Sequence, residues 1–192
     1  MAGVIDTGEF RKGLKIEIDG EPYEITDFQH VKPGKGAAFV RTTYRSMISG
    51  RVLQNNFRSG DKFTRPDIEE KDMSYLYVQA GDYYFMEEKT FEQTFISEKV
   101  LAENKNFLKE NIRVSILFFN GKAIGVSLPN SVDLKVTKCD PGVRGDTVSG
   151  AMKPATLETG YVVNVPLFIN EGDVLKIDTR DGKYLTRVAT GG

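Results

Sequence analysis

The stretch LKIEIDGEPYEI, residues 14–25, joins a strand pattern to a tight-turn signal. Leu14, Ile16 and Ile18 alternate with charged residues, as expected of a β-strand that buries one face. Asp19-Gly20 follows, a pair that favours two-residue hairpin turns, and then a second strand-like segment returns. The stretch therefore predicts an antiparallel β-hairpin.

The same strand–turn–strand pattern recurs in each third of the 192-residue chain. Asn120-Gly121 separates VSILFF from KAIGVSL, and Asp181-Gly182 separates DVLKIDT from KYLTRVA. Such regular repetition favours an all-β chain of three small barrels over one large sandwich. Proline and polar residues interrupt the strand pattern near residues 63–72 and 127–133, which predicts domains at 1–65, 66–129 and 130–192.

One helix is expected, in SEKVLAENKNFLKEN, residues 97–111. Ser97 is a suitable N-cap, glutamate occupies the first turn, and Leu101 and Leu108 share a face. A single helix in a segment of this size is typical of an OB-type barrel.

Composition removes several classes of function. No apolar run approaches the length of a membrane span, and the N-terminus lacks a signal-peptide pattern, so we expect a cytoplasmic protein. His30 and Cys139 are the only histidine and cysteine, which disfavours His-paired catalysis, an internal disulfide and Cys- or His-rich metal sites. No metal, cofactor or catalytic residue is expected.

Charge is unevenly distributed although the net charge is only −1. Between Asp27 and Asp61 there is no acidic residue. The six basic residues of this segment are Lys32, Lys35, Arg41, Arg45, Arg51 and Arg58. A run of one sign favours contact with RNA or phosphate, although a solvated edge that discourages strand aggregation is the alternative.

KPGKG, residues 32–36, lies between two predicted strands. Pro33 and Gly34 suit the two central positions of a type II turn, and Gly36 gives the chain freedom at the exit, so Lys35 should project from the tip. On the returning strand Arg41 and Arg45 share one face.

Other interpretations of Lys35 fit less well. A nucleotide-binding P-loop needs a hydroxyl residue after the lysine and a helix beyond it, whereas Gly36 and a strand follow here. A Schiff-base lysine is activated by burial or a neighbouring cation, and a glycine-flanked tip offers little burial. An ordinary surface lysine accounts for the residue itself but not for the acid-free flanks.

Two further classes remain as alternatives. Tyr83, Tyr84 and Phe85 could stack bases in a general single-stranded RNA-binding protein, but alternation favours strand residues that are partly core. Glu69-Glu70 and Glu87-Glu88 could suggest a carboxylate-based hydrolase, but adjacent side chains point apart on a strand or helix.

Several motifs resemble the elongation factor P family of bacteria. FQHVKPGKGAAFVR (28–41) resembles the loop of its first domain, and KPATLETGYVVNVPLFINEG (153–172) resembles its C-terminal signature. LYVQAGDYYFME (76–87) and FEQTFIS (91–97) are similar to its middle domain. The resemblance covers essentially the whole chain. It implies a monomer of three barrels in an L-shaped arrangement, the first SH3-like and the others OB-type.

The resemblance also implies a function. Members of this family bind both ribosomal subunits between the peptidyl-tRNA and exit sites and relieve stalls at consecutive prolines. Lys35 would point toward the acceptor end of peptidyl-tRNA, and in many relatives a modifying enzyme extends the matching residue. The residues of this chain expected to contact tRNA or other RNA are Lys32, Pro33, Gly34, Lys35, Gly36, Arg41, Arg45, Gly145, Asp146, Thr147, Tyr184 and Arg187. Of these, Gly145, Asp146 and Thr147 match a loop near the exit-site codon of the mRNA.

Overall fold

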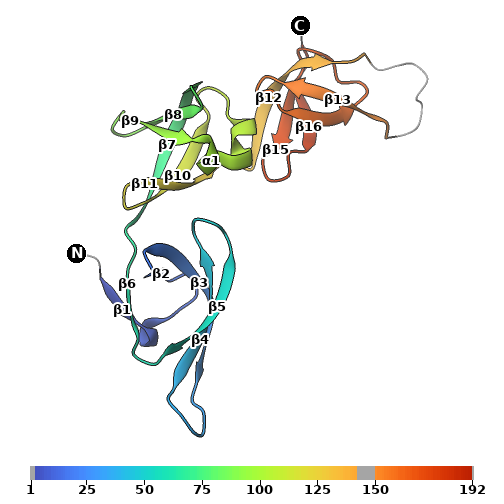
Figure 1. Cartoon of the computed structure of the whole chain (residues 1–192). Helices are drawn as coiled ribbons and strands as arrows, with labels where there is room; N and C mark the ends of the chain where they lie inside the picture. Colours follow the sequence, from blue (N-terminus) through green and yellow to red (C-terminus); the bar gives the residue numbers. More distant parts are fainter. Residues whose placement is uncertain (1–2, 142–149, 192) are drawn as a thin grey trace. The chain divides into compact units, whose positions relative to one another are not determined.

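The computed structural model describes residues 3–141 and 150–191. The described chain is dominated by strands arranged in three sheets (Figure 1), so the prediction of an all-β fold is confirmed. The sheets lie within residues 1–65, 66–129 and 130–192. The chain also groups into two compact units, residues 1–70 with 117–125 and residues 71–116 with 126–192. The domain boundaries themselves stay a prediction.

The first sheet has the strand order β1-β6-β2-β3-β4-β5, and each strand in it runs antiparallel to its neighbours. Its strands are β1 (Val4–Asp6), β2 (Lys15–Ile18), β3 (Glu21–Val31), β4 (Phe39–Ser46), β5 (Val52–Arg58) and β6 (Lys62–Thr64). A short 3-10 turn, η1 (Thr7–Glu9), follows β1 and is closed by a capping box between Asp6 and Glu9.

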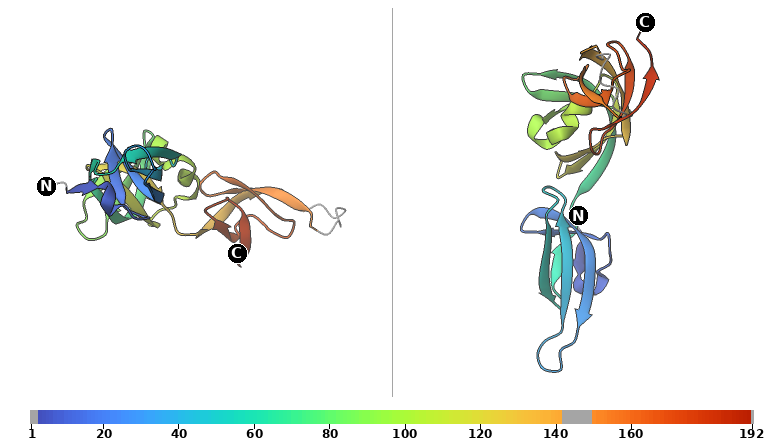
Figure 2. Two further views of the ribbon diagram at one scale, coloured as in Figure 1. Left: turned by 90° about the horizontal axis from the view of Figure 1, so that it is seen from below. Right: turned by 90° about the vertical axis from the view of Figure 1, so that its right-hand side faces the viewer.

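The other two sheets each contain five strands. The second has the order β11-β10-β7-β8-β9 and the third the order β14-β13-β12-β15-β16 (Figures 1 and 2). The second is built from β7 (Ile68–Gln79), β8 (Asp82–Glu87), β9 (Gln93–Ser97), β10 (Arg113–Phe119) and β11 (Lys122–Ser127). The third is built from β12 (Ser131–Cys139), β13 (Met152–Leu157), β14 (Val162–Pro166), β15 (Val174–Asp178) and β16 (Tyr184–Ala189).

All three predicted hairpins form, but only two of them have the expected two-residue turn. Asp19-Gly20 and Asn120-Gly121 form two-residue turns with positive φ at both positions. β15 and β16 are instead joined by residues 179–183, which include Asp181-Gly182. The backbone N–H of Asp178 still donates to the carbonyl of Lys183 at 2.9 Å, and within the longer turn the Asp178 carboxylate accepts a hydrogen bond from the backbone N–H of Arg180 at 2.9 Å.

The predicted helix over 97–111 is much shorter in the structure. It comprises α1 (Glu98–Leu101), followed by the 3-10 segment η2 (Ala102–Phe107). Ser97 does occupy the N-cap position, but its side chain makes no capping hydrogen bond. The α-helix ends because Ala102 has φ 49° and ψ −127°, outside any helical region. The anchoring residues Leu101 and Leu108 are both buried, as the pattern predicted.

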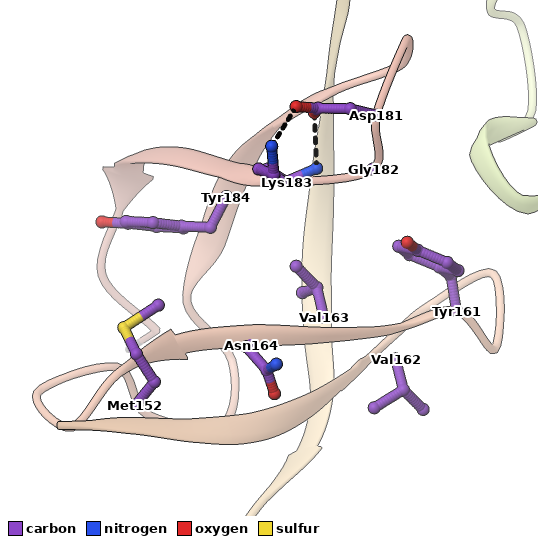
Figure 3. Close-up of a pocket in the computed structure, with 9 residues that line it drawn as sticks. All are labelled: Met152, Tyr161, Val162, Val163, Asn164, Asp181, Gly182, Lys183 and Tyr184. Carbon is purple, nitrogen blue, oxygen red and sulfur yellow. Dashed lines mark hydrogen bonds and ion pairs between the residues drawn. The ribbon is translucent and has the colours of Figure 1, made fainter.

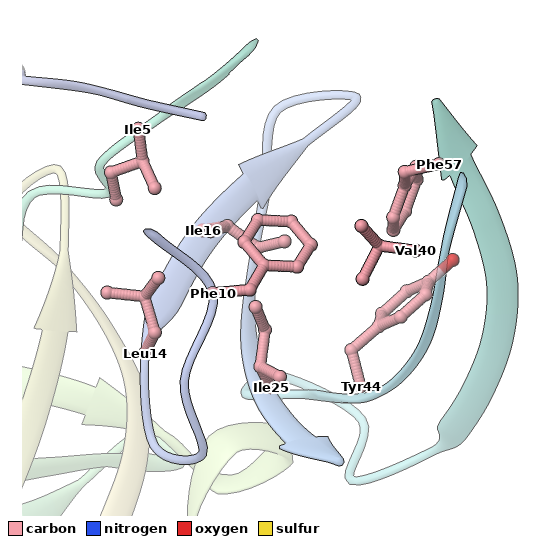
Figure 4. Close-up of a cluster of buried hydrophobic side chains, with 8 residues drawn as sticks. All are labelled: Ile5, Phe10, Leu14, Ile16, Ile25, Val40, Tyr44 and Phe57. Carbon is pink, nitrogen blue, oxygen red and sulfur yellow. The ribbon is translucent and has the colours of Figure 1, made fainter. Parts of the chain in front are cut away.

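The core of the first barrel fixes which faces of β3 and β4 point outward. Figure 4 shows eight buried side chains converging from the strands of this sheet and the segment between β1 and β2. They are Ile5, Phe10, Leu14, Ile16, Ile25, Val40, Tyr44 and Phe57. Phe10 packs edge-on against Phe57, with ring centroids 6.2 Å apart. Because Val40 and Tyr44 belong to this cluster, the alternate residues of β4 face solvent.

Ala102 provides a test of backbone strain at the end of α1. Its φ and ψ lie near those of the first central residue of a type II′ turn, where glycine dominates. Ala102→Gly should therefore raise the free energy of unfolding by about 1 kcal/mol. Ala102→Val is the matched control and should lower it, because a β-branched side chain fits this region worse. Urea unfolding of the full-length chain measures the change in both variants. A glycine variant that is less stable than the wild type would show that the strain is absent.

Candidate nucleic-acid interface

The β3–β4 hairpin carries the loop that the sequence singled out. The two strands stay paired to their ends, where Val31 lies opposite Phe39 and Gln29 opposite Arg41. Residues 32–38 therefore form the loop that joins the two paired strands. Figures 1 and 2 show β3 and β4 as a long ribbon extending from the first barrel. The pairing gives the loop a stiff base.

The loop itself differs from the predicted type II turn. The chain bends at residues 34–36, and the positive φ of 109° belongs to Gly36, not to Gly34. A loop of this length does not need a four-residue reversal, so the change of direction is spread over more residues. The expectation of a tight turn at Pro33-Gly34 is therefore wrong, whereas the expectation of an exposed tip is right.

Lys32 and Lys35 are exposed, as are Pro33, Gly34 and Gly36 between and beside them. In the part of the chain that the structure describes, no acidic side chain forms an ion pair with either lysine. Glycines on both sides leave Lys35 without side-chain neighbours along the chain. Its ammonium group can therefore reach a phosphate or a hydroxyl group without first breaking an internal contact.

Arg41 and Arg45 both point outward from β4, while Val40, Thr42 and Tyr44 are buried. The prediction that the arginines share the solvent face is confirmed. Their surroundings differ, because Arg41 lies opposite Gln29 on β3 whereas Arg45 lies opposite Glu24. The positive surface is therefore strongest near the loop and weaker at Arg45.

Acidic side chains return to the surface at the base of the hairpin. Asp27 forms an exposed ion pair with Lys12, with Nζ and Oδ1 3.0 Å apart. The hydrogen bond and charge of Lys12 lower the pKa of Asp27, which stays ionised. The segment without acids in the sequence is thus not wholly free of acids in space, and the basic surface is confined to the outer half of the hairpin.

Polar neighbours of Arg41 were not identified from the sequence. Gln29 and Asn56 are exposed and flank Arg41 on the two adjacent strands. Both amides can hydrogen-bond to phosphate or sugar oxygens. Their position beside Arg41 follows only from the register of the three strands, because nothing in their local sequence is distinctive.

Tyr184 lines a hollow of the third sheet with a volume of about 480 Å³ (Figure 3). Figure 3 shows Tyr184 and Met152 on one side of the hollow and Tyr161 on the other. Lys183 is held in place by Asp181, with Nζ and Oδ2 2.7 Å apart. Gly182 has φ 71° and lies so close to the Tyr161 hydroxyl that any larger residue would displace the ring. The hollow thus lies between β13 and β14 on one side and the loop between β15 and β16 on the other.

Arg187 is engaged inside its own domain. Its Nη1 lies 3.3 Å from Oδ2 of the buried Asp173, and its guanidinium lies over the Phe168 ring at 5.2 Å. Burial alone would raise the pKa of Asp173, but backbone hydrogen bonds from Asn170 and Gly191 and the contact with Arg187 outweigh it and lower the pKa. The assignment of Arg187 and Tyr184 to RNA contact stays a prediction. Gly145, Asp146 and Thr147 lie outside the described residues.

The two carboxylates of the Glu87-Glu88 pair point to different partners, as alternation predicted. Glu87 pairs with Lys71, which lowers the pKa of its carboxyl group, whereas Glu88 contacts Arg113 and Ser74. The paired carboxylates thus bind different partners. Over residues 3–141 and 150–191, no group of three or more His, Cys, Asp or Glu side chains could hold a metal ion. No helix in these ranges is long and apolar enough to span a bilayer.

Comparison with known proteins agrees with this architecture along the whole chain. Residues 6–63 match the KOW-like domain of elongation factor P, residues 68–126 its OB domain, and residues 132–187 its C-terminal domain. Elongation factor P of Bdellovibrio bacteriovorus is 54% identical over 184 residues, which span 96% of this chain and 98% of that protein. The chain belongs to the bacterial elongation factor P family. It is therefore a translation elongation factor.

Other relatives and solved structures support the same family and fold. Elongation factor P of Maridesulfovibrio salexigens is 55% identical over 96% of this chain and 99% of that protein. A solved structure of eukaryotic translation initiation factor 5A from Methanococcus jannaschii matches with a TM-score of 0.52 and 23% identity. The match covers 65% of this chain and 96% of that structure, and at this identity it supports only the all-β fold of the matched part.

Asp178 offers a pH-dependent test of the loop between β15 and β16, which lines one side of the hollow. Two side-chain hydrogen bonds from Arg180, at 2.9 and 2.5 Å, lower its pKa to about 2. The carboxylate therefore stabilises the fold at pH above the ordinary aspartate value, and this contribution is lost as the pH falls toward 2. In Arg180→Ala the pKa should rise toward about 3.9, which NMR titration of the carboxyl carbon measures.

Lys183→Ala is the matched control for this titration, because Lys183 lies in the same loop and acts on Asp178 only through its charge. It should raise the pKa of Asp178 less than Arg180→Ala does. Equal shifts in both variants would mean that general charge, and not the hydrogen bonds from Arg180, sets this pKa.

Proposed function

We propose that this elongation factor binds both ribosomal subunits between the peptidyl-tRNA and exit sites and relieves stalls at consecutive prolines. In this proposal it contributes no catalytic acid or base. It positions peptidyl-tRNA so that the ribosome's own chemistry proceeds. The observation that carries the proposal is the bare, exposed Lys35 at the end of a hairpin whose strands remain paired up to the loop.

Positioning is a sufficient mechanism for a slow acceptor such as proline. The ring of proline restricts the approach of its secondary amine, so a misplaced peptidyl-tRNA costs rate. Holding two reactants in a productive geometry can recover several kcal/mol of the barrier. A paired β-ribbon suits this task, because its base is fixed while a single flexible cation extends from the end.

The chemistry of the loop fits contact with the acceptor arm of tRNA. The ammonium group of Lys35 is a compact charge with three donors, able to bind phosphate oxygens or sugar hydroxyls. Lys32 and Arg41 add charge on the same hairpin. The whole chain has a net charge of only −1, which limits nonspecific binding to RNA.

An enzyme that modifies Lys35 is a further proposed partner. The glycines around Lys35 leave its side chain accessible, and lengthening the side chain would extend the reach of its donors. No cofactor beyond such a covalent extension is proposed. The intact mass of the protein purified from its native host distinguishes an extended Lys35 from a bare lysine.

Lys35→Ala tests the assigned role directly. The residue is exposed, so the variant should fold normally but lose most rescue of Pro-Pro-Pro synthesis in a reconstituted translation system. Lys122→Ala is the matched control, because Lys122 is also an exposed lysine beside a hairpin turn. It should retain full rescue. Full rescue by Lys35→Ala would refute the role of the loop.

Charge reversal at Arg41 tests the proposed RNA contact of the hairpin. Arg41→Glu should weaken ribosome binding and make the dependence of log affinity on log salt concentration shallower by about one unit, as expected for a lost phosphate contact. Lys62→Glu changes the net charge equally on β6 of the same sheet and should have a smaller effect. If both variants bind as the wild type does, β4 is not an RNA contact.

A further inference from the structure

A row of aromatic side chains crosses the second sheet. Tyr77 on β7 lies opposite Tyr84 on β8, and Tyr84 lies opposite Phe95 on β9. The rings of Tyr77 and Tyr84 are stacked, with centroids 4.8 Å apart and an interplanar angle of 19°. Phe95 continues the row at 6.2 Å from Tyr84. We call these three residues the aromatic ladder.

The aromatic ladder is not part of the core. Tyr77 is 46% exposed and Phe95 is 59% exposed. The opposite face of the same strands is buried, with Tyr75, Phe85 and Ile96 all less than 10% exposed. The sheet therefore buries one set of aromatic residues and exposes the other to solvent. Contiguous exposed apolar surface of this kind marks interaction sites.

The strands that carry the ladder are acidic as a segment, although Glu87 is paired with Lys71 and Glu88 with Arg113. Residues 68–97, which form β7, β8 and β9, contain seven acidic and two basic side chains, a net charge of −5. Asp82 lies two residues from Tyr84 on the same face of β8. This charge has the opposite sign to that of the β3–β4 loop, and it opposes the approach of a nucleic-acid backbone.

We propose that the aromatic ladder binds an arginine-rich segment of a partner protein. Guanidinium groups are planar, stack on aromatic faces and are attracted to the negative charge of ring faces. Asp82 on the same face, together with the net negative charge of the three strands, attracts a basic segment over a distance and opposes the approach of RNA. The chain already contains one such contact, because Arg187 lies over the Phe168 ring at 5.2 Å.

This inference goes beyond the proposed function. It concerns a protein partner and not RNA, it uses a different sheet, and it does not depend on Lys35. Peptide binding to the ladder can therefore fail while the loop acts as proposed, and the reverse is equally testable.

Octa-arginine and octa-lysine peptides of equal charge provide the test, with the isotope-labelled full-length chain. Titration followed by amide NMR should shift signals of β7, β8 and β9 around the ladder. Octa-arginine should bind about two- to fivefold more tightly than octa-lysine, since stacking at an exposed site adds modest affinity. Both affinities should fall as salt is raised, because the attraction is electrostatic.

Three variants separate stacking from charge and from apolar area. Phe95→Leu keeps an apolar side chain but removes the ring face, so it should abolish most of the preference for arginine. Tyr77→Ser should do the same from the other end of the ladder. Phe91→Ser is the matched control, because Phe91 is 70% exposed in the adjacent turn between β8 and β9 but lies outside the ladder. It should leave the preference unchanged.

Several outcomes would overturn the proposal. Equal affinities of the wild-type protein for octa-arginine and octa-lysine would by themselves contradict the stacking of guanidinium groups on the ladder. If octauridylate shifts the same signals and binds with higher affinity than octa-arginine, the ladder is a base-stacking surface instead. Ladder signals that move with protein concentration alone, together with a dimer in sedimentation, would assign the face to a second copy of the chain.

Discussion

The pairing of β3 with β4 is the constraint on which the candidate interface depends. Val40 and Tyr44 are buried in the core of the first barrel, so β4 cannot rotate without exposing them. The register from this core to the Val31–Phe39 pair then fixes where the loop begins. Core packing thus determines, at a distance, that Arg41 faces solvent and that the Lys35 loop extends from a stiff base.

Much of the fold follows from local chemistry that the sequence displays. Asp19-Gly20 and Asn120-Gly121 adopt the positive φ values that their side chains tolerate, so those hairpins were predictable. Ala80-Gly81 forms a turn of the same kind between β7 and β8, with φ 52° and 87°, yet alanine does not favour this region. Its conformation is imposed by the pairing of the flanking strands.

The candidate site was predictable in its residues but not in its surroundings. Exposure of Lys35 follows from the glycines beside it, and the outward direction of Arg41 follows from alternation. The nearness of Glu24 to Arg45, and of Gln29 and Asn56 to Arg41, depends on the register between strands. A one-residue shift would replace all of these neighbours, and the local sequence does not determine the register.

Two β-bulges explain why simple alternation fails where the surfaces become distinctive. In a regular strand Tyr75 and Tyr77 would share a face, but the register shifts between them, so Tyr75 is 8% exposed and Tyr77 is 46% exposed. A similar shift between Ile25 and Asp27 on β3 leaves Ile25 in the core and Asp27 free to pair with Lys12 at the surface. Both bulges move a side chain from the buried face to solvent. The exposure of Tyr77 in the aromatic ladder and of Asp27 at the base of the basic hairpin therefore have the same cause. In each case a β-bulge adds one residue to a strand and reverses which side chains beyond it face solvent.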